Sequence, residues 1–154
     1  MIFREAKTAD IPQIQIVRLA VKENVLSDAS LVTDQDCVEY LTVRGKGWVR
    51  EIDNQIVGFA IADLQDNNIW ALFLIPEFEK QGIGRQLHKT MLDWYFSKKT
   101  DPVWLSTSPG TRADQFYRKC GWTETGKYGT SQIRFEMTVE KWLSANTLPS
   151  VSNH

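Results

Sequence analysis

The sequence has few of the residues that build disulfide-rich, metal-binding or membrane proteins. Its two cysteines, Cys37 and Cys120, are isolated and form no Cys-x-x-Cys or metal-binding spacing. With only His88 and His154 as histidines, we expect no metal site. No run of eighteen apolar residues is present, so we expect no membrane span. The first residues, MIFREAKTAD, lack the apolar core of a signal peptide, which indicates a protein of the reducing cytoplasm.

The remaining composition is typical of a globular protein. The 154 residues are 42% hydrophobic and 24% charged, and the formal net charge is −1. A chain of this length buries about 70% of its unfolded surface, so it can fold alone. We predict a single domain over residues 1–145 and a flexible tail over residues 146–154. Because the net charge is close to zero, nothing favours nonspecific binding to nucleic acid or to a membrane surface.

The clearest pattern in the sequence lies between residues 69 and 95. Residues 69–75 read IWALFLI, an apolar run that predicts a strand buried on both faces. Pro76 ends this strand. From Ile83 onward, large apolar residues recur at the spacing of one helical face, and His88 lies on the other face. Gly82 and Gly84 therefore lie where a strand turns into a helix.

This strand, glycine loop and helix form a candidate anion site. A glycine lets a ligand approach the backbone closely because it has no Cβ. The first amides of a helix lack intrahelical acceptors and carry the positive end of the dipole, which suits phosphate. The sequence has no Gly-Lys-Ser/Thr of a Walker loop, and KQGIG is too short for the three-glycine dinucleotide fingerprint. Taken alone, the two glycines fit a tight turn without a ligand equally well.

Two helices are predicted before this strand. The first has an apolar stripe at Ile11, Ile14, Val17, Val21 and Val25, and a cap at Thr8 or Asp10. A polar break at residues 27–30 separates it from the second helix. Thr33 and Asp36 lie near capping-box spacing at the start of the second helix, and Gly45 and Gly47 are predicted to end it.

Six further strands and one further helix complete the prediction. The strands are expected at residues 2–5, 48–52, 56–63, 103–106, 122–125 and 133–139. Asp53 and Asn54 form a hairpin turn between the second and third of these strands. The helix carries Ala113, Phe116, Tyr117 and Cys120 on one side and is closed by Gly121.

Two blocks of the sequence, at residues 76–87 and 113–122, resemble motifs A and B of the GNAT superfamily of N-acetyltransferases. They read PEFEKQGIGRQL and ADQFYRKCGW, in the order and at the separation typical of the family. Two positions depart from the family pattern. Glu79 replaces a glutamine or arginine, and Gly110 replaces an asparagine that helps to hold the cofactor in many members. We expect the Glu79 side chain to face solvent, because a carboxylate would oppose a bound diphosphate.

The resemblance implies an α+β GNAT fold, with a central, mostly antiparallel mixed sheet of about seven strands flanked by about four helices. It implies that acetyl-CoA is the cosubstrate, with no metal. Its pantetheine arm would bind the backbone around Leu72, Phe73 and Leu74, as an added strand does. Its diphosphate would bind the loop Glu79, Lys80, Gln81, Gly82, Ile83, Gly84 and Arg85. Basic side chains near the motifs could also meet its phosphates, and among Lys80, Arg85, Lys89, Arg118 and Lys119 we favour Arg85.

The resemblance also implies the chemistry. Tyr117, whose phenol has a reference pKa of about 10, would protonate the leaving thiolate as general acid; the alternative is a core aromatic residue. A lysine-like amine of pKa about 10.4 is harder to deprotonate than an α-amine of about 7.7 to 8.0. No acidic residue on the predicted strands 69–75 and 103–106 is a convincing base. Glu51 and Asp63 are weak candidates, and deprotonation through water is the default.

The sequence leaves the acceptor open. We expect a small-molecule or peptide amine, recognised by the first two helices and by a wall near Trp48, Trp70 and Trp104. A homodimer is possible. The rival interpretations are a noncatalytic acyl-CoA-binding sensor module of the same fold and a nucleotide-binding regulatory domain that uses the same glycine loop.

Overall fold

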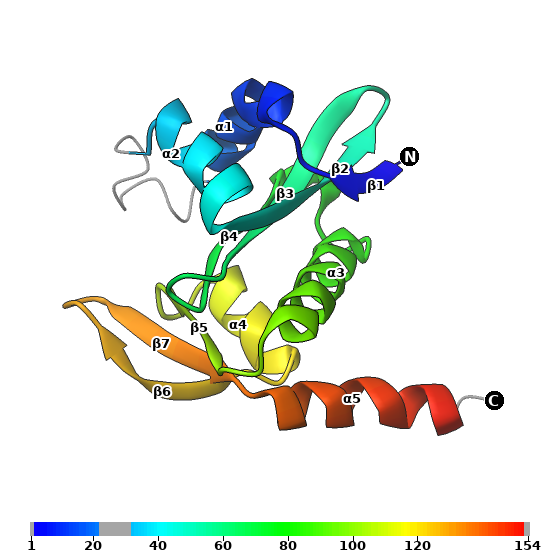
Figure 1. Cartoon of the computed structure of the whole chain (residues 1–154), viewed down its shortest axis with the longest axis vertical. Helices are drawn as coiled ribbons and strands as arrows, with labels where there is room; N and C mark the ends of the chain where they lie inside the picture. The colour runs from blue at the N-terminus through cyan, green and yellow to red at the C-terminus, as the bar shows by residue number, and fades with distance from the viewer. Residues whose placement is uncertain (1, 22–31, 153–154) are drawn as a thin grey trace. The chain divides into compact units, whose positions relative to one another are not determined.

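The computed structural model describes residues 2–21 and 32–152, with side chains to residue 145. The chain divides into two compact units, Met1–Tyr95 and Phe96–His154, whose boundary lies near the end of a helix. Figure 1 shows the course of the chain through both units. The single domain expected over residues 1–145 stays a prediction.

The first unit is built on an antiparallel sheet of four strands in the order β1-β2-β3-β4. The strands are β1 (Ile2–Glu5), β2 (Gly45–Ile52), β3 (Gln55–Asp63) and β4 (Asn68–Leu74). The predicted turn at Asp53 and Asn54 is confirmed. Both residues have positive φ, 52° and 65°, as a tight hairpin between twisted strands requires.

Helices cover both faces of this sheet (Figure 1). Helix α1 (Ile11–Ala20) packs on β3 and β4, and α2 (Asp34–Glu39) packs beside α1. On the other face lies α3 (Ile83–Lys98). The predicted capping box of α2 is confirmed, because Thr33 Oγ1 accepts from the Asp36 amide at 3.1 Å and Asp36 Oδ2 accepts from the Thr33 amide at 3.0 Å.

The first helix is shorter than predicted. Ile11, Ile14 and Val17 are buried as expected, but the helix ends at Ala20 and Val21 has an extended backbone. The stripe position Val25 and the break at 27–30 lie outside the described residues. Asp10 precedes α1 without a side-chain capping bond, since its carboxylate accepts from Arg4 and from the Lys7 amide.

The predicted end of the second helix was wrong. After α2 the chain continues as a π-helix, Tyr40–Arg44, and Gly45 already begins β2. A Cβ on Gly45 would lie 1.7 Å from the Ala62 carbonyl oxygen, and one on Gly47 would lie 2.6 Å from Leu41 Cδ2. These glycines therefore allow close packing within the sheet and against the π-helix, and they do not cap a helix.

The second unit contains a three-stranded antiparallel sheet in the order β5-β7-β6. Its elements are β5 (Val103–Thr107), α4 (Arg112–Lys119), β6 (Thr123–Tyr128), β7 (Gln132–Met137) and α5 (Val139–Ser152). Val103, Leu105, Phe135 and Met137 form its buried face. The α+β class and the seven strands are confirmed. The described residues hold five helices, one more than expected, because α5 was not predicted.

Candidate functional site

The glycine loop lies between the end of β4 and the start of α3, as predicted. A short 3-10 turn, Pro76–Phe78, follows the strand. Lys80 and Gly82 then adopt positive φ values of 66° and 83°. A Cβ on Gly82 would meet no atom within 4 Å, so glycine is needed there for its backbone conformation and not for lack of space. Lys80, Gln81 and Gly82 are all exposed, so a ligand can reach this turn.

The amides at the start of α3 are available to an anion. The Gln86 amide donates to the Gly82 carbonyl at 3.1 Å, so the intrahelical hydrogen bonds begin at Gln86. Within the described part of the chain, the amides of Ile83, Gly84 and Arg85 have no acceptor. Unsatisfied amides at the positive end of a sixteen-residue helix can bind an anion.

The basic residues near the motifs separate into two groups. Among the described residues, the side chains of Lys80 and Arg85 have neither a hydrogen bond nor an ion pair, and both are exposed. Lys89 is paired with Asp93 at 2.7 Å. Arg118 is bound to two carboxylates. Among the described residues Lys119 is likewise exposed and unpaired, but it lies beside the second motif. Lys80 and Arg85 are therefore the unpaired cations that flank the amides at the start of α3.

Glu79 does not simply face solvent. Its side chain is half-buried and its Oε1 atom is buried. The expectation that this side chain turns outward was therefore wrong for one of its two oxygens. Its amide donates to the Pro76 carbonyl at 3.2 Å, which fixes the turn before Lys80.

The backbone of β4 offers hydrogen-bonding groups on the side away from β3. The Ile75 amide donates to the Val57 carbonyl at 2.8 Å, which makes this a hydrogen-bonded pair. Because such pairs alternate along an antiparallel ladder, Phe73 also points its amide and carbonyl toward β3. Leu72 and Leu74 point theirs away. Of the three predicted residues, these two can offer backbone groups to a ligand.

A β-bulge interrupts β4 at Trp70. Ala71 pairs with Ile61 and Ile69 pairs with Ala62, so one step on β3 matches two steps on β4. Bulges redirect side chains and are frequent beside active sites. This one lies at the opposite end of β4 from the glycine loop.

His88 lies on the buried face of α3, one turn after Arg85. The sequence predicted it on the polar face, but it is 2% exposed. Burial, and to a smaller degree the positive charge of Arg85, lowers the pKa of His88 to about 4. The imidazole is therefore neutral at pH 7. The 3.6-residue period did not reveal this, because a wide apolar stripe includes positions on either side of its centre.

Tyr117 lies in the core of the second unit. It is 6% exposed, and its ring contacts Phe116, Trp122 and Phe135. Burial, followed by the neighbouring Cys120, raises the pKa of Tyr117 well above its usual value. Its hydroxyl therefore stays protonated and is a weaker acid than a free phenol.

The turn before α4 is closed by its own side chains. Asp114 Oδ2 accepts from the Gly110 amide at 2.8 Å, and its Oδ1 accepts from Arg118 Nε at 2.7 Å. The bond from Gly110, more than the one from Arg118, lowers the pKa of Asp114. Thr111 caps the helix by accepting from the Asp114 amide. The amide of Gly110 is therefore bonded within the protein.

The two candidate bases have structural roles. Glu51 accepts from Arg4 Nε at 2.6 Å. Asp63 is 1% exposed, binds Arg44 at 2.8 Å and accepts from the Gln65 amide at 2.9 Å. Both carboxylates are engaged within the first unit, which disfavours either of them as a general base.

Comparison with known proteins decides the family. A model described as the acetyltransferase (GNAT) family matches residues 14–122, which includes the glycine loop and Tyr117. The chain belongs to the GNAT family of acetyltransferases. No curated protein matches the chain.

Solved structures share the GNAT fold with this chain. The PaiA N-acetyltransferase of Thermoplasma acidophilum, in complex with coenzyme A, has a TM-score of 0.76 at 17% identity, over 89% of this chain and 98% of that one. A GNAT acetyltransferase of Staphylococcus aureus Mu50 has a TM-score of 0.77 at 18% identity, over 90% and 98%. The ribosomal-protein-alanine N-acetyltransferase of Brucella melitensis has a TM-score of 0.72 at 20% identity, over 90% and 100%.

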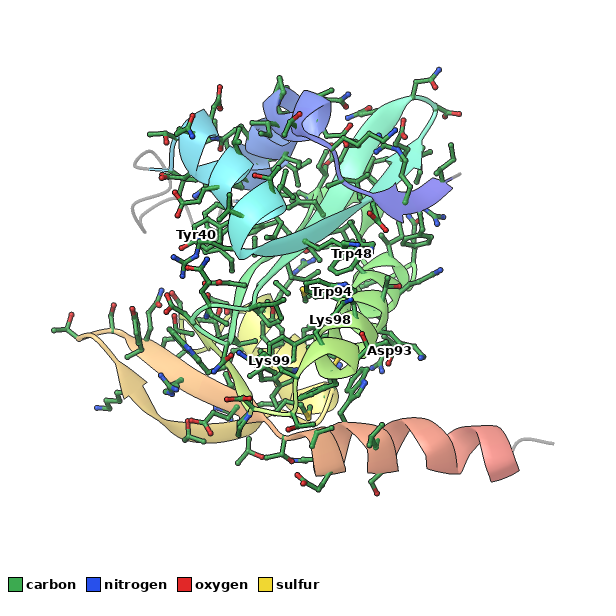
Figure 2. The ribbon with its side chains drawn as sticks, viewed as in Figure 1. Tyr40, Trp48, Asp93, Trp94, Lys98 and Lys99 are labelled. Carbon is green, nitrogen blue, oxygen red and sulfur yellow. The ribbon has the colours of Figure 1, made fainter. Side chains whose placement is uncertain are left out.

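The three tryptophans expected to form one wall have different surroundings in this GNAT chain. Trp48 is 7% exposed and packs edge-on against Trp94 of α3. Figure 2 shows these two rings together and Tyr40 well apart from them. Trp70 stacks on Tyr40, and Trp104 lies under the guanidinium of Arg134. Trp48 therefore belongs to the core.

In the part of the chain that the structure describes, no three His, Cys, Asp or Glu side chains are grouped as metal ligands. Over the same residues, no helix has both the length and the apolar character that crossing a bilayer demands.

Proposed function

We propose that this GNAT chain transfers the acetyl group of acetyl-CoA to a primary amine. The observation that carries the proposal is the set of amides without an acceptor at Ile83, Gly84 and Arg85, flanked by two unpaired cations in the described chain. A diphosphate fits this set because it brings several acceptor oxygens and negative charge. The CoA complex of the Thermoplasma relative is consistent with the same cosubstrate.

The length and direction of β4 support the position of the acyl group. The arm of CoA between diphosphate and sulfur is about as long as four residues of extended chain. From the glycine loop, an arm of this length would run back along β4 past Leu74 and Leu72, where the outward amides and carbonyls could bind its two amide groups. The thioester would then lie toward the strand's bulged end.

In the reaction, acetyl-CoA supplies an activated thioester, the amine nitrogen bonds to the carbonyl carbon, and the carbon–sulfur bond breaks. An outward amide of β4 can stabilise the charge that builds on the carbonyl oxygen, by about 3 kcal/mol if it acts as other oxyanion donors do. The amine loses a proton, for which no base is assigned among the described carboxylates, and water is the proposed acceptor.

Tyr117 is the proposed donor to the leaving sulfur, a role that rests on its place in the second motif. A thiol has a pKa of about 8.5, below the raised pKa of Tyr117, so complete proton transfer to a free thiolate is uphill. The hydroxyl therefore acts chiefly by donating a hydrogen bond to the sulfur as negative charge develops there. Such a donor lowers the barrier without leaving a charged phenolate in a buried site.

The test of the function combines CoA titration calorimetry with thiol release from acetyl-CoA in the presence of an amine library. Binding of CoA together with amine-dependent thiol release supports the enzyme. Binding without release from any amine supports the acyl-CoA sensor. Competition by ATP but not by CoA supports the nucleotide-binding domain and contradicts the proposal.

Tyr117→Phe separates the two roles of that residue. We expect turnover to fall by about 10- to 100-fold with little change in the affinity for acetyl-CoA, because the hydroxyl acts on the leaving group. The ring packing is kept, so the melting temperature should change little. Turnover equal to the parent would remove Tyr117 from the mechanism.

A further inference from the structure

The pair Tyr40 and Trp70 forms a rigid aromatic wall at the bulged end of β4. Their ring centroids are 4.0 Å apart and their planes differ by 8°. Tyr40 comes from the π-helix and Trp70 is the bulged residue of β4, so two irregular elements are needed to bring the rings together. π-Helical turns and β-bulges both concentrate at functional sites.

Arg44 holds this wall in place. Its guanidinium carbon lies 4.9 Å from the centre of the Tyr40 ring. Because Trp70 covers one face of that ring, Arg44 covers the other. Arg44 is itself fixed by Asp63, which is 1% exposed, at 2.8 Å. The hydrogen bond that Arg44 donates to Asp63 raises the pKa of Arg44, so the cation is permanent.

Trp70 is partly exposed, and Tyr40 stacks on one of its two faces. Within the described part of the chain, the Trp70 ring contacts no ring or cation other than Tyr40. Across the same residues, neither the Tyr40 hydroxyl nor the Trp70 indole nitrogen has a hydrogen-bond partner. Both side chains are partly exposed. The wall therefore offers one flat apolar face and two polar ring atoms at its edge.

The position of the wall along β4 places it beside the expected site of the acceptor amine. On the proposed function, the arm of CoA runs from the glycine loop toward the bulge, and Leu72 lies beside the thioester. Trp70 is two residues further along, about 7 Å from Leu72. An amine that attacks the thioester would place the group attached to it beside Trp70.

We infer that Trp70 and Tyr40 determine acceptor specificity, and that the acceptor is a primary amine with an aromatic ring two or three carbons from its nitrogen. This inference rests on the proposed function. The acceptor ring continues the stack of Arg44, Tyr40 and Trp70. The acceptor ring can pack on the Trp70 indole with little loss of side-chain conformational entropy in the protein, because Arg44 already orders the wall.

The test compares two probes, 2-phenylethylamine and n-butylamine, by the ratio of their kcat/KM values in thiol release. The parent should favour the aromatic amine by about tenfold, as expected of one stacked ring. Trp70→Ala should bring the ratio close to one, and Tyr40→Ala should lower it. Tyr40→Phe, which keeps the ring, should retain the preference. Val43→Ala is the matched control, because Val43 lies on the same π-helix and is 70% exposed.

The ratio does not depend on the fraction of folded enzyme, so loss of stability cannot imitate the result. CoA titration calorimetry on each variant should give affinities within about twofold of the parent, since the wall is placed at the acceptor. If the parent binds CoA but shows no aromatic preference, favours a diamine, uses neither probe, or keeps its preference in Trp70→Ala, the inference is overturned and the acetyltransferase proposal is untouched. Failure of the parent to bind CoA would instead overturn the proposed function.

Discussion

The helices α3 and α4 each begin after a glycine-containing turn, but the two turns are completed in opposite ways. Before α4, the Gly110 amide and Arg118 are both bound by Asp114. At the start of α3, three amides have no acceptor among the described residues, and Lys80 and Arg85 have no partner there. The turn before α4 is stabilised by its own carboxylate. The turn before α3 leaves its positive potential for a ligand. A glycine and a cation near a helix start are therefore not enough to define an anion site.

Gly84→Asp should remove the difference between the two turns, and its effect on CoA binding should be the largest. The new carboxylate would stand among the amides that have no acceptor in the described chain, where it repels a diphosphate and can occupy the donors itself. We expect the Kd for CoA to rise by more than about 100-fold. Calorimetric titration measures it. Gly84→Ala is the control, because alanine suits a helical position and adds no charge. Unchanged CoA affinity in Gly84→Asp would contradict the loop assignment.

Acid should weaken α3 through its buried histidine. The pKa of His88 is depressed to about 4 from an ordinary 6.5, so the unfolded chain binds more protons between these values. The stabilising effect of a neutral His88 is complete above pH 6.5 and is lost as the pH falls to 4, by about 3 kcal/mol. Urea unfolding at several pH values measures it.

His88→Gln serves as the comparison for the acid effect, because the carboxylates titrate equally in both proteins. The difference in unfolding free energy between parent and variant should change across pH 6.5 to 4. A difference that stays constant with pH would show that His88 does not carry the effect.

Asp114→Ala tests the closed turn of α4. It leaves the Gly110 amide and Arg118 without their shared acceptor, so we expect the unfolding free energy to fall by about 2 to 3 kcal/mol. Asp114→Asn, which keeps one acceptor oxygen, should lose less. In urea unfolding, we expect a lower midpoint and an unchanged dependence of the unfolding free energy on urea concentration. No loss of stability would mean that the turn does not depend on its own carboxylate.

Arg85→Gln should have the smallest effect on CoA binding, and it tests whether the unpaired cation at the start of α3 serves the ligand. Arg85 is exposed and unpaired in the described chain, so its loss should leave stability unchanged and weaken CoA binding by about five- to tenfold. Because the contact is electrostatic, the difference should shrink at high salt. Lys89→Gln is the control, since Lys89 is already paired with Asp93. Equal losses in the two variants would argue for a general effect of charge.

Much of the glycine loop was predictable because its signals are local. An apolar run followed by proline, glycine and an apolar helical period describes β4, the loop and α3 within about thirty residues. The capping box of α2 is equally local, since Thr33 and Asp36 contact one another across three residues. The two sequence motifs then indicated the family and its fold. Local periodicity alone would have left the tight-turn alternative open.

Other parts of the site depend on contacts between residues far apart in the chain. Gly45 reads as a helix end, but the Ala62 carbonyl, seventeen positions away, leaves no room for a side chain there. The place of Glu79, the burial of His88 and the availability of Arg85 depend on which groups meet them in three dimensions. The Tyr40–Trp70 wall needs a π-helix and a bulge, and neither irregularity has a sequence signal of its own.

The sequence by itself determined where the strands and helices form around the glycine loop, because period, caps and glycines act over a few neighbouring residues. Only the tertiary structure decided which charges and rings stay available, because availability depends on every group that comes near. Arg85 and Arg118 are the same residue type beside the two motifs, yet two carboxylates occupy Arg118, while the described chain brings none to Arg85.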